Sequence, residues 1–134
     1  DSTINRHGVR MGTSEIYAAV EALDEIVDSL VIDLEALGRE SYMPMFVVLR
    51  EGATLDEDLK ARIKQKLRTE VSPRHAPDDI FEISEVPYTL SGKKMEVPIR
   101  KILLGEDVHK AANPGAMRNP DSLGFFVDFA RTHP

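Results

Sequence analysis

The stretch MPMFVVLREGATLDEDLKARIKQKLRTE, residues 43–70, places a short apolar run directly before a longer amphipathic segment. Residues 43–50 are rich in β-branched and aromatic types, which is typical of a strand. In the second part, large aliphatic residues recur every four positions, which predicts a helix with one apolar side: Leu55, Leu59, Ile63 and Leu67. Thr54 and Glu57 are spaced as a capping box, so we expect this helix to run from there towards Glu70.

Short apolar runs on either side of this stretch predict the other strands. Residues 27–34 (VDSLVIDL) have the same character as residues 43–50, and a polar loop containing Gly38 separates the two, so we expect an antiparallel pair. Residues 80–83 (IFEI) add a third strand after prolines have ended the helix. Together these runs predict a central three-stranded, mainly antiparallel sheet.

The N-terminal residues predict a β-hairpin followed by a helix. Ile4 and Val9 flank a His-Gly pair, which is typical of two short strands joined by a glycine turn. Thr13 is placed to cap a helix that ends near Asp24, with apolar residues at helical spacing.

The C-terminal third predicts a basic helix over residues 97–104, which stops at Gly105. From Glu106 the composition becomes polar, and a few apolar residues would anchor a final helix: Leu123, Phe125, Phe126 and Phe129. The predicted fold is therefore a small α+β domain, with an N-terminal β-hairpin and a central sheet packed by helices.

Composition limits the classes of protein that this chain can represent. A length of 134 residues with 42% hydrophobic content suits one core and one domain. The absence of cysteine excludes disulfides and Cys-based zinc sites, and no apolar run has bilayer-spanning length, so we expect a soluble, cytoplasmic protein. A net charge of −6 argues against general binding to nucleic acid or anionic membranes. The chain begins at Asp1 rather than Met, so we expect it to be part of a longer polypeptide.

The segment PYTLSGKK, residues 87–94, is the first candidate site. Pro87 restricts the backbone and Gly92 permits a tight turn, so the loop can present Lys93 outwards. A single ammonium with no neighbouring base suits electrostatic stabilisation of phosphate or carboxylate charge better than proton transfer. The alternative is a solvated surface lysine. A P-loop is not expected, because the full GxxxxGK[ST] pattern is missing.

The hairpin is the second candidate site, because Gly8 would permit close approach of a ligand and Arg6 and Arg10 would each suit a phosphate. An ordinary hairpin with exposed arginines is the alternative. The histidines have no ligand-like spacing, so no intrinsic metal site is expected: His7, His75, His109 and His133. The carboxylates near the end of the first helix are expected to be dipole partners or solvated groups rather than catalytic acids: Asp24, Glu25 and Asp28.

Two segments together resemble the last two sequence motifs of the adenylate-forming enzyme superfamily, nearest to its acyl-CoA synthetases. They are DSTINRHGVRMGTSEIY, residues 1–17, and VPYTLSGKKMEVPIRKIL, residues 86–103. The sequences of residues 8–17 (GVRMGTSEIY), residues 72–102 and the NP-containing tail are most similar to the branch that activates acetoacetate. Residues 91–96 read SGKKME where many acyl-CoA synthetases have SGKIMR, and the acetoacetate branch shares this variant.

The resemblance implies an acid–thiol ligase that uses ATP and CoA as substrates, with Mg²⁺ bound mainly by a large N-terminal domain of the same polypeptide. Lys93 would serve the adenylation step, and it would be a target for a lysine acetyltransferase and deacetylase. Asp1 would be the hinge, and Gly8 and Arg10 would bind CoA. Residues 1–12 would form the hinge and hairpin of a mobile domain, and residues 106–134 a C-terminal extension.

Alternatives remain open at this point. The chain would instead belong to an acetyl- or other short-chain acyl-CoA synthetase if its parent enzyme activates another acid. It would be a non-catalytic nucleotide- or CoA-binding module if no ATP-binding domain precedes it. An interaction domain that docks through residues 125–129 would need neither Lys93 nor Gly8.

Overall fold

The computed structural model describes residues 3–6, 9–34 and 42–133, and describes side chains from Gly12 onwards. The strands are β1 (Thr3–Arg6), β2 (Val9–Gly12), β3 (Ile26–Val31), β4 (Pro44–Leu49) and β5 (Asp79–Glu82). The α-helices are α1 (Thr13–Glu21), α2 (Glu57–Glu70), α3 (Glu96–Leu103), α4 (Val108–Ala111) and α5 (Leu123–Thr132). Short 3₁₀ turns are η1 (Pro73–His75), η2 (Pro114–Ala116) and η3 (Pro120–Ser122). The α+β class is confirmed.

Two sheets form, as predicted. β1 and β2 make an antiparallel hairpin, and the central sheet has the strand order β3-β4-β5. β3 and β4 are antiparallel, whereas β5 lies parallel to β4, so the sheet is mixed. The parallel pairing follows from the connection, because α2 crosses over between β4 and β5 and returns the chain to the same end of the sheet. The predicted loop around Gly38 lies outside the described residues.

The helix over residues 57–70 is confirmed, but its predicted cap is wrong. Asp56 is the N-cap residue, and its carboxylate accepts a hydrogen bond of 2.8 Å from Leu59 N. Thr54 lies two residues too early, since the backbone becomes helical only at Glu57. Three of the four residues of the predicted apolar side are buried at helical spacing, with exposed fractions of 1% or less: Leu59, Ile63 and Leu67. The fourth, Leu55, precedes the helix and is only partly buried.

The first helix also begins differently from the prediction. Gly12 is its N-cap residue and makes no side-chain cap, while Thr13 is already helical and buried. The helix ends at Glu21, earlier than the predicted Asp24, and a turn then leads into β3. Ile16 and Val20 point into the core as their spacing predicts.

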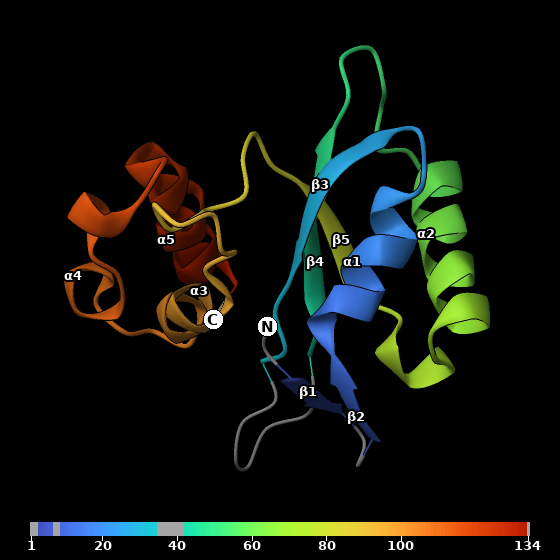
Figure 1. Cartoon of the computed structure of the whole chain (residues 1–134), viewed down its shortest axis with the longest axis horizontal. Helices are drawn as coiled ribbons and strands as arrows, with labels where there is room; N and C mark the ends of the chain where they lie inside the picture. The colour runs from blue at the N-terminus through green and yellow to red at the C-terminus, as the bar shows by residue number, and fades with distance from the viewer. Residues whose placement is uncertain (1–2, 7–8, 35–41, 134) are drawn as a thin grey trace.

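Helices cover both faces of the central sheet (Figure 1). Because side chains alternate along a strand, Met45 and Val47 of β4 face one core and Phe46 faces a second one. α1 and α2 pack in the first core, and α3 and α5 pack in the second. The sheet is thus the middle layer of three. The lysine loop described below connects β5 of this sheet to α3.

The polar C-terminal region is packed on the body of the domain. The predicted final helix is α5, with Leu123, Phe126 and Phe129 buried and Phe125 partly exposed. The Phe126 and Phe129 rings meet Phe46 edge-to-face, with centroid separations of 5.0 and 5.2 Å. Such pairs add about 0.5–1.5 kcal/mol beyond the burial of apolar area. Within the described ranges, no helix has the length and apolar character that crossing a membrane requires.

Candidate functional site

The lysine loop is a tight turn between β5 and α3. Tyr88 and Lys94 face each other in an antiparallel bridge, and Thr89 N donates to Lys93 O at 2.9 Å. Gly92 has a φ of +87°, a conformation that side-chain-bearing residues rarely adopt. The turn therefore depends on glycine at this position, as the sequence predicted.

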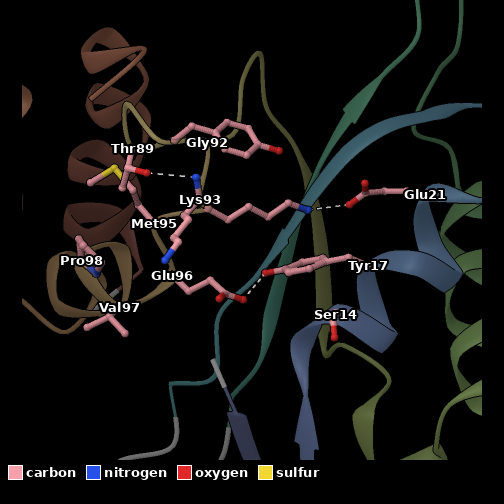
Figure 2. A pocket seen from close by; sticks show the side chains of 12 residues that line it. Ser14, Tyr17, Glu21, Thr89, Gly92, Lys93, Met95, Glu96, Val97 and Pro98 are labelled. Carbon is pink, nitrogen blue, oxygen red and sulfur yellow. Dashed lines mark hydrogen bonds and ion pairs between the residues drawn. The ribbon is translucent and has the colours of Figure 1, made fainter. Parts of the chain in front are cut away.

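Two hydroxyl groups fix the inside of the turn. Thr89 Oγ1 accepts a hydrogen bond of 3.1 Å from Lys93 N (Figure 2). Thr89 Oγ1 also lies 3.0 Å from Ser91 Oγ. The bond to Lys93 N holds the backbone of this residue. The Lys93 side chain itself is exposed. It has no hydrogen bond or ion pair with any residue that the structure describes. The loop thus fixes the backbone of Lys93 and leaves its ammonium group without a partner among the described residues.

The Lys93 side chain borders a hollow of about 670 Å³ between the loop, α1 and the first turn of α3 (Figure 2). Apolar walls alternate with hydroxyl, carboxylate and ammonium groups around this hollow. Its lining residues are Ser14, Tyr17, Glu21, Tyr88, Thr89, Gly92, Lys93, Lys94, Met95, Glu96, Val97 and Pro98. A hollow that is open on one side and lined in this way suits a charged group brought to it by another surface.

Lys94, the next residue, has the opposite environment. Its Nζ lies 2.7 Å from Glu21 Oε2, 2.7 Å from Ser29 O and 3.2 Å from Asp28 Oδ1. The ammonium also lies 3.5 Å from the centre of the Tyr17 ring. Successive residues of an extended segment point to opposite sides, which separates the two lysines. The sequence analysis did not assign a role to Lys94, although this alternation was a signal for it.

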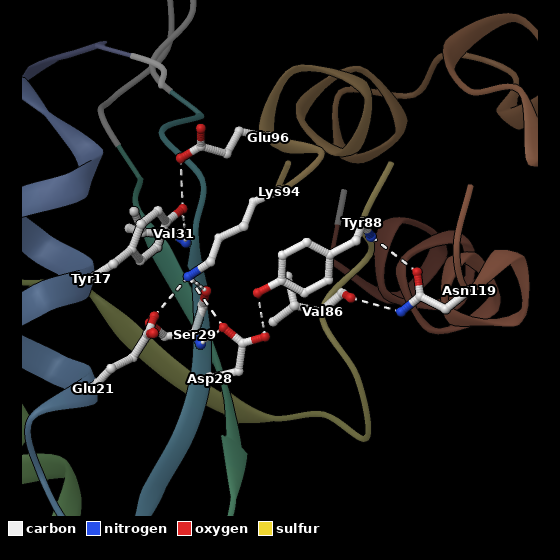
Figure 3. A network of polar contacts seen from close by, with 10 residues as sticks. All are labelled: Tyr17, Glu21, Asp28, Ser29, Val31, Val86, Tyr88, Lys94, Glu96 and Asn119. Carbon is white, nitrogen blue, oxygen red and sulfur yellow. Dashed lines mark hydrogen bonds and ion pairs between the residues drawn. The ribbon is translucent and has the colours of Figure 1, made fainter. Parts of the chain in front are cut away.

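Two tyrosines complete this polar network (Figure 3). Tyr17 OH donates to Glu96 Oε2 at 2.6 Å, and Tyr88 OH donates to Asp28 Oδ2 at 2.6 Å. Burial and then the adjacent carboxylate raise the pKa of both tyrosines above the ordinary range. Asp28, expected to be a dipole partner or solvated group, instead joins Tyr88 to Lys94. The network thereby ties the loop to α1 and β3.

The other predicted site residues fall in the N-terminal hairpin. Arg10 lies in β2, where it pairs with Asn5 of β1. The side chain of Arg10, together with Asp1 and Gly8, lies outside what the structure describes. Among the predicted site residues, the structure therefore describes the surroundings of Lys93 alone.

A second hollow, of about 420 Å³, lies where α2 ends and η1 begins. Three cationic side chains line it, Lys64, Arg68 and Arg74, together with Asp78. Such a surface suits a phosphate-bearing ligand. The sequence analysis missed it because the three residues are spread over two elements. Within residues 3–6, 9–34 and 42–133, no cluster of three or more His, Asp or Glu side chains could hold a metal ion.

Sequence comparisons connect this chain with known enzymes. The family model for the AMP-binding enzyme C-terminal domain matches residues 15–93. Acetoacetyl-CoA synthetase of Caenorhabditis elegans is 42% identical over 130 residues, which cover 96% of this chain and 18% of that protein. Acetoacetyl-coenzyme A synthetase of Rhizobium meliloti is 38% identical over 127 residues, covering 95% of this chain and 19% of that protein.

Solved structures agree with the sequence comparisons. Acetoacetyl-CoA synthetase from Streptomyces lividans has a TM-score of 0.88 and 47% identity, over 100% of this chain and 20% of that chain. An acyl-CoA synthetase from Brucella canis shares the fold, with a TM-score of 0.62 at 23% identity, over 70% of this chain and 17% of that chain. The chain spans about a fifth of the length of these relatives. It therefore belongs to the family of AMP-binding enzyme C-terminal domains and is homologous to part of the acetoacetyl-CoA synthetases.

Proposed function

We propose that this chain is the mobile C-terminal domain of an ATP-dependent, AMP-forming acid–thiol ligase. The parent enzyme converts acetoacetate, ATP and CoA into acetoacetyl-CoA, AMP and pyrophosphate. The similarity over nearly the whole chain to acetoacetyl-CoA synthetases of an animal and two bacteria supports this substrate. The acyl pocket and the Mg²⁺ site belong mainly to the N-terminal domain of the same polypeptide.

The Lys93 ammonium, exposed and without a partner among the described residues, is the observation that supports the role of this domain most directly. In adenylation, a carboxylate attacks the α-phosphate of ATP, and negative charge concentrates between the two groups. A positioned cation orients the carboxylate and offsets the charge that develops in the transition state. Because no base adjoins Lys93 Nζ within the described residues, the role is electrostatic rather than proton transfer.

The second half-reaction uses the hairpin face. Rotation about Asp1 withdraws Lys93 and brings Gly8 to the pantetheine arm of CoA, while Arg10 meets a CoA phosphate. The basic hollow lined by Lys64, Arg68 and Arg74 supports phosphate binding by this domain. A hinge at Asp1 and separate faces for the two steps explain why Lys93 stands without other catalytic groups.

The test measures the two half-reactions separately in the full-length synthetase. Lys93→Ala is expected to lower acetoacetate-dependent ATP–pyrophosphate exchange at least about 100-fold, as loss of a preorganised electrostatic group does. Thioester formation from supplied acetoacetyl-adenylate should change less than about twofold, because Lys93 makes no contact in that step. Lys101→Ala removes another exposed lysine, from α3, and should leave both half-reactions unchanged.

Equal loss of both half-reactions in Lys93→Ala would reject the assigned role. A substrate panel on the same enzyme separates acetoacetate from acetate and other short acids. Preference for acetate would reject the acetoacetate assignment and keep the domain assignment. The 134-residue chain alone should form no acyl-CoA, because it lacks the acyl pocket.

A further inference from the structure

A C-terminal segment pairs with the lysine loop along the side opposite to α1. Two backbone hydrogen bonds make this pairing, Leu90 N to Ala116 O at 3.0 Å and Arg118 N to Tyr88 O at 3.0 Å, and together they form the antiparallel bridge between Thr89 and Met117. On its other side, the same backbone pairs with residues 93 and 94. Residues 88–90 are therefore the middle of three paired segments, and residues 116–118 form one edge.

Asn119 completes the pairing with its side chain (Figure 3). Its Nδ2 donates to Val86 O at 2.8 Å, and its Oδ1 accepts from Tyr88 N at 3.0 Å. These two groups flank Pro87, which has no N–H of its own. A single amide thus satisfies the backbone on both sides of the proline at which the lysine loop begins.

This use of Asn119 contrasts with that of Asn113 in the same segment. Both asparagines occupy the N-cap position of a 3₁₀ turn that begins with proline. Asn113 caps its own turn, because its Oδ1 accepts from Gly115 N at 3.0 Å. Asn119 makes no such side-chain cap, although its backbone carbonyl accepts from Ser122 N just as the Asn113 carbonyl accepts from Ala116 N. The Asn119 side chain is directed to the lysine loop rather than to its own helix.

The segment that carries Asn119 is itself anchored. Met117 and Leu123 lie on either side of it in the second core, with exposed fractions of 4% and 5%. The fully buried Phe126 follows and packs on Phe46 of the central sheet. The contacts of Asn119 therefore connect the loop to the hydrophobic core, whereas the Lys93 side chain has no hydrogen bond or ion pair within the described part of the chain.

We propose that Asn119 is a positioning residue for Lys93, acting through the backbone of residues 86–88. The proposal rests on the proposed function of Lys93 in adenylation. The match to the family model ends at Lys93, so Asn119 lies beyond it. Removal of the amide frees the start of the loop and lets the ammonium depart from the geometry that the reacting carboxylate and phosphate need. Displacement by about 1 Å can lower a rate by about 100-fold.

The experiment compares Asn119→Ala, Asn119→Asp and Asn113→Ala in the full-length synthetase. Asn119→Ala should lower kcat for acetoacetate-dependent ATP–pyrophosphate exchange about tenfold or more, with KM for acetoacetate within about twofold. Thioester formation from supplied acetoacetyl-adenylate should stay within about twofold of the parent enzyme. Asn119→Asp keeps an acceptor for Tyr88 N but turns a second carboxylate oxygen towards Val86 O, so its exchange rate should also fall. Asn113→Ala should match the parent enzyme in both half-reactions.

Amide hydrogen exchange supplies a readout that does not depend on activity. Residues 88–94 should exchange faster in Asn119→Ala than in Asn113→Ala, while α2 should be unchanged in both. If Asn119→Ala fails to fold, Asn119→Asp carries the same test with the side-chain size unchanged.

An unchanged exchange rate, a rise in KM alone, or equal loss of both half-reactions in the Asn119 variants would overturn the positioning role. Lys93→Ala separates this failure from failure of the proposed function. If Lys93→Ala abolishes adenylation while the Asn119 variants leave its rate unchanged, only the inference on Asn119 fails. If Lys93→Ala leaves adenylation intact, the proposed function fails as well.

Discussion

Lys94 Nζ lies 2.7 Å from Glu21 Oε2, which ties the residue next to Lys93 to the last residue of α1. The Lys94 side chain is only 16% exposed and also contacts Asp28 and the Tyr17 ring. The two adjacent lysines therefore have different roles in the loop. Lys94 fixes the loop to the domain, and this leaves Lys93 free to meet a ligand.

Replacement of Lys94 should destabilise the domain. Lys94→Met keeps most of the side-chain length but leaves Glu21 and Asp28 without their shared cation. We expect the free energy of unfolding of the 134-residue chain to fall by about 1–3 kcal/mol, since partly buried carboxylates lose a charged hydrogen-bond partner. Urea denaturation measures this loss.

Lys66→Met is the matched control for that experiment. Lys66 Nζ lies 2.7 Å from Glu70 Oε2, the same separation as in the Lys94–Glu21 pair, but on the outside of α2. A surface pair at this helical spacing contributes about 0.2–0.5 kcal/mol. Equal losses of unfolding free energy in the two variants would show that the contacts of Lys94 stabilise the domain no more than a surface ion pair does.

Acetylation should select Lys93 over Lys94. The reaction needs an accessible, unpaired amine, and Lys94 is bound by two carboxylates and the Ser29 carbonyl. If release of Lys94 requires at least about 1.4 kcal/mol, modification of Lys93 is favoured at least about tenfold. Limiting acetic anhydride followed by peptide mass spectrometry gives the ratio of the two products.

A variant that releases Lys94 provides the control. Glu21→Gln combined with Asp28→Asn removes both negative partners and should raise modification of Lys94 relative to Lys93. A product ratio near one in the unaltered chain would contradict the difference in environment that the structure shows.

The helices and strands could be predicted because each is encoded by its local periodicity. The apolar side of α2 and the strand-forming run of β4 are examples, and both are confirmed. The position of a cap is harder to predict: Thr54, Asp56 and Glu57 all suit a helix start, and only the path of the backbone selects Asp56. The parallel pairing of β5 likewise depends on how α2 crosses the sheet.

The polar contacts around Lys93 could not be predicted, because they join residues far apart in the chain. Tyr17 and Glu96 are 79 positions apart, and Asp28 and Tyr88 are 60 apart. Nothing in the local sequence distinguishes Asp28 from a solvated carboxylate, or Asn119 from a capping asparagine. Lys93 could be chosen because its loop is a local motif.

The domain should lose stability in alkaline solution through Tyr17. Burial and the Glu96 carboxylate raise the pKa of Tyr17 in the folded chain, whereas in the unfolded chain it stays near its ordinary value of about 10. The contribution of protonated Tyr17 to the free energy of unfolding is therefore fully present below about pH 10. It is lost as the pH rises towards the pKa that Tyr17 has in the folded chain. The expected loss is about 1.4 kcal/mol per pH unit.

Tyr17→Phe isolates this contribution. At pH 8 the variant should be less stable than the parent chain, because the hydrogen bonds of Tyr17 to Glu96 and Val31 N are gone. Between pH 10 and 11, Tyr17 loses its proton in the unfolded parent chain but keeps it in the folded one. The difference in unfolding free energy between the two chains should therefore shrink by about 1 kcal/mol. Lysines also titrate in this range, but they affect both chains alike. Denaturant unfolding at each pH measures this difference, and a difference that stays constant would show that the pKa of Tyr17 is not raised.

The hairpin residues should affect the CoA step more than adenylation. Under the proposed function, Arg10 binds a CoA phosphate, and a bulky side chain at Gly8 obstructs the pantetheine arm. In the full-length synthetase, Arg10→Ala and Gly8→Val should each slow thioester formation about tenfold, the effect of losing about 1.4 kcal/mol of transition-state binding. ATP–pyrophosphate exchange should change less than about twofold, because it proceeds in the other domain orientation.

Arg131→Ala removes a positive charge from the exposed end of α5 and should leave both steps unchanged. If exchange falls as much as thioester formation in the hairpin variants, these residues do not serve CoA.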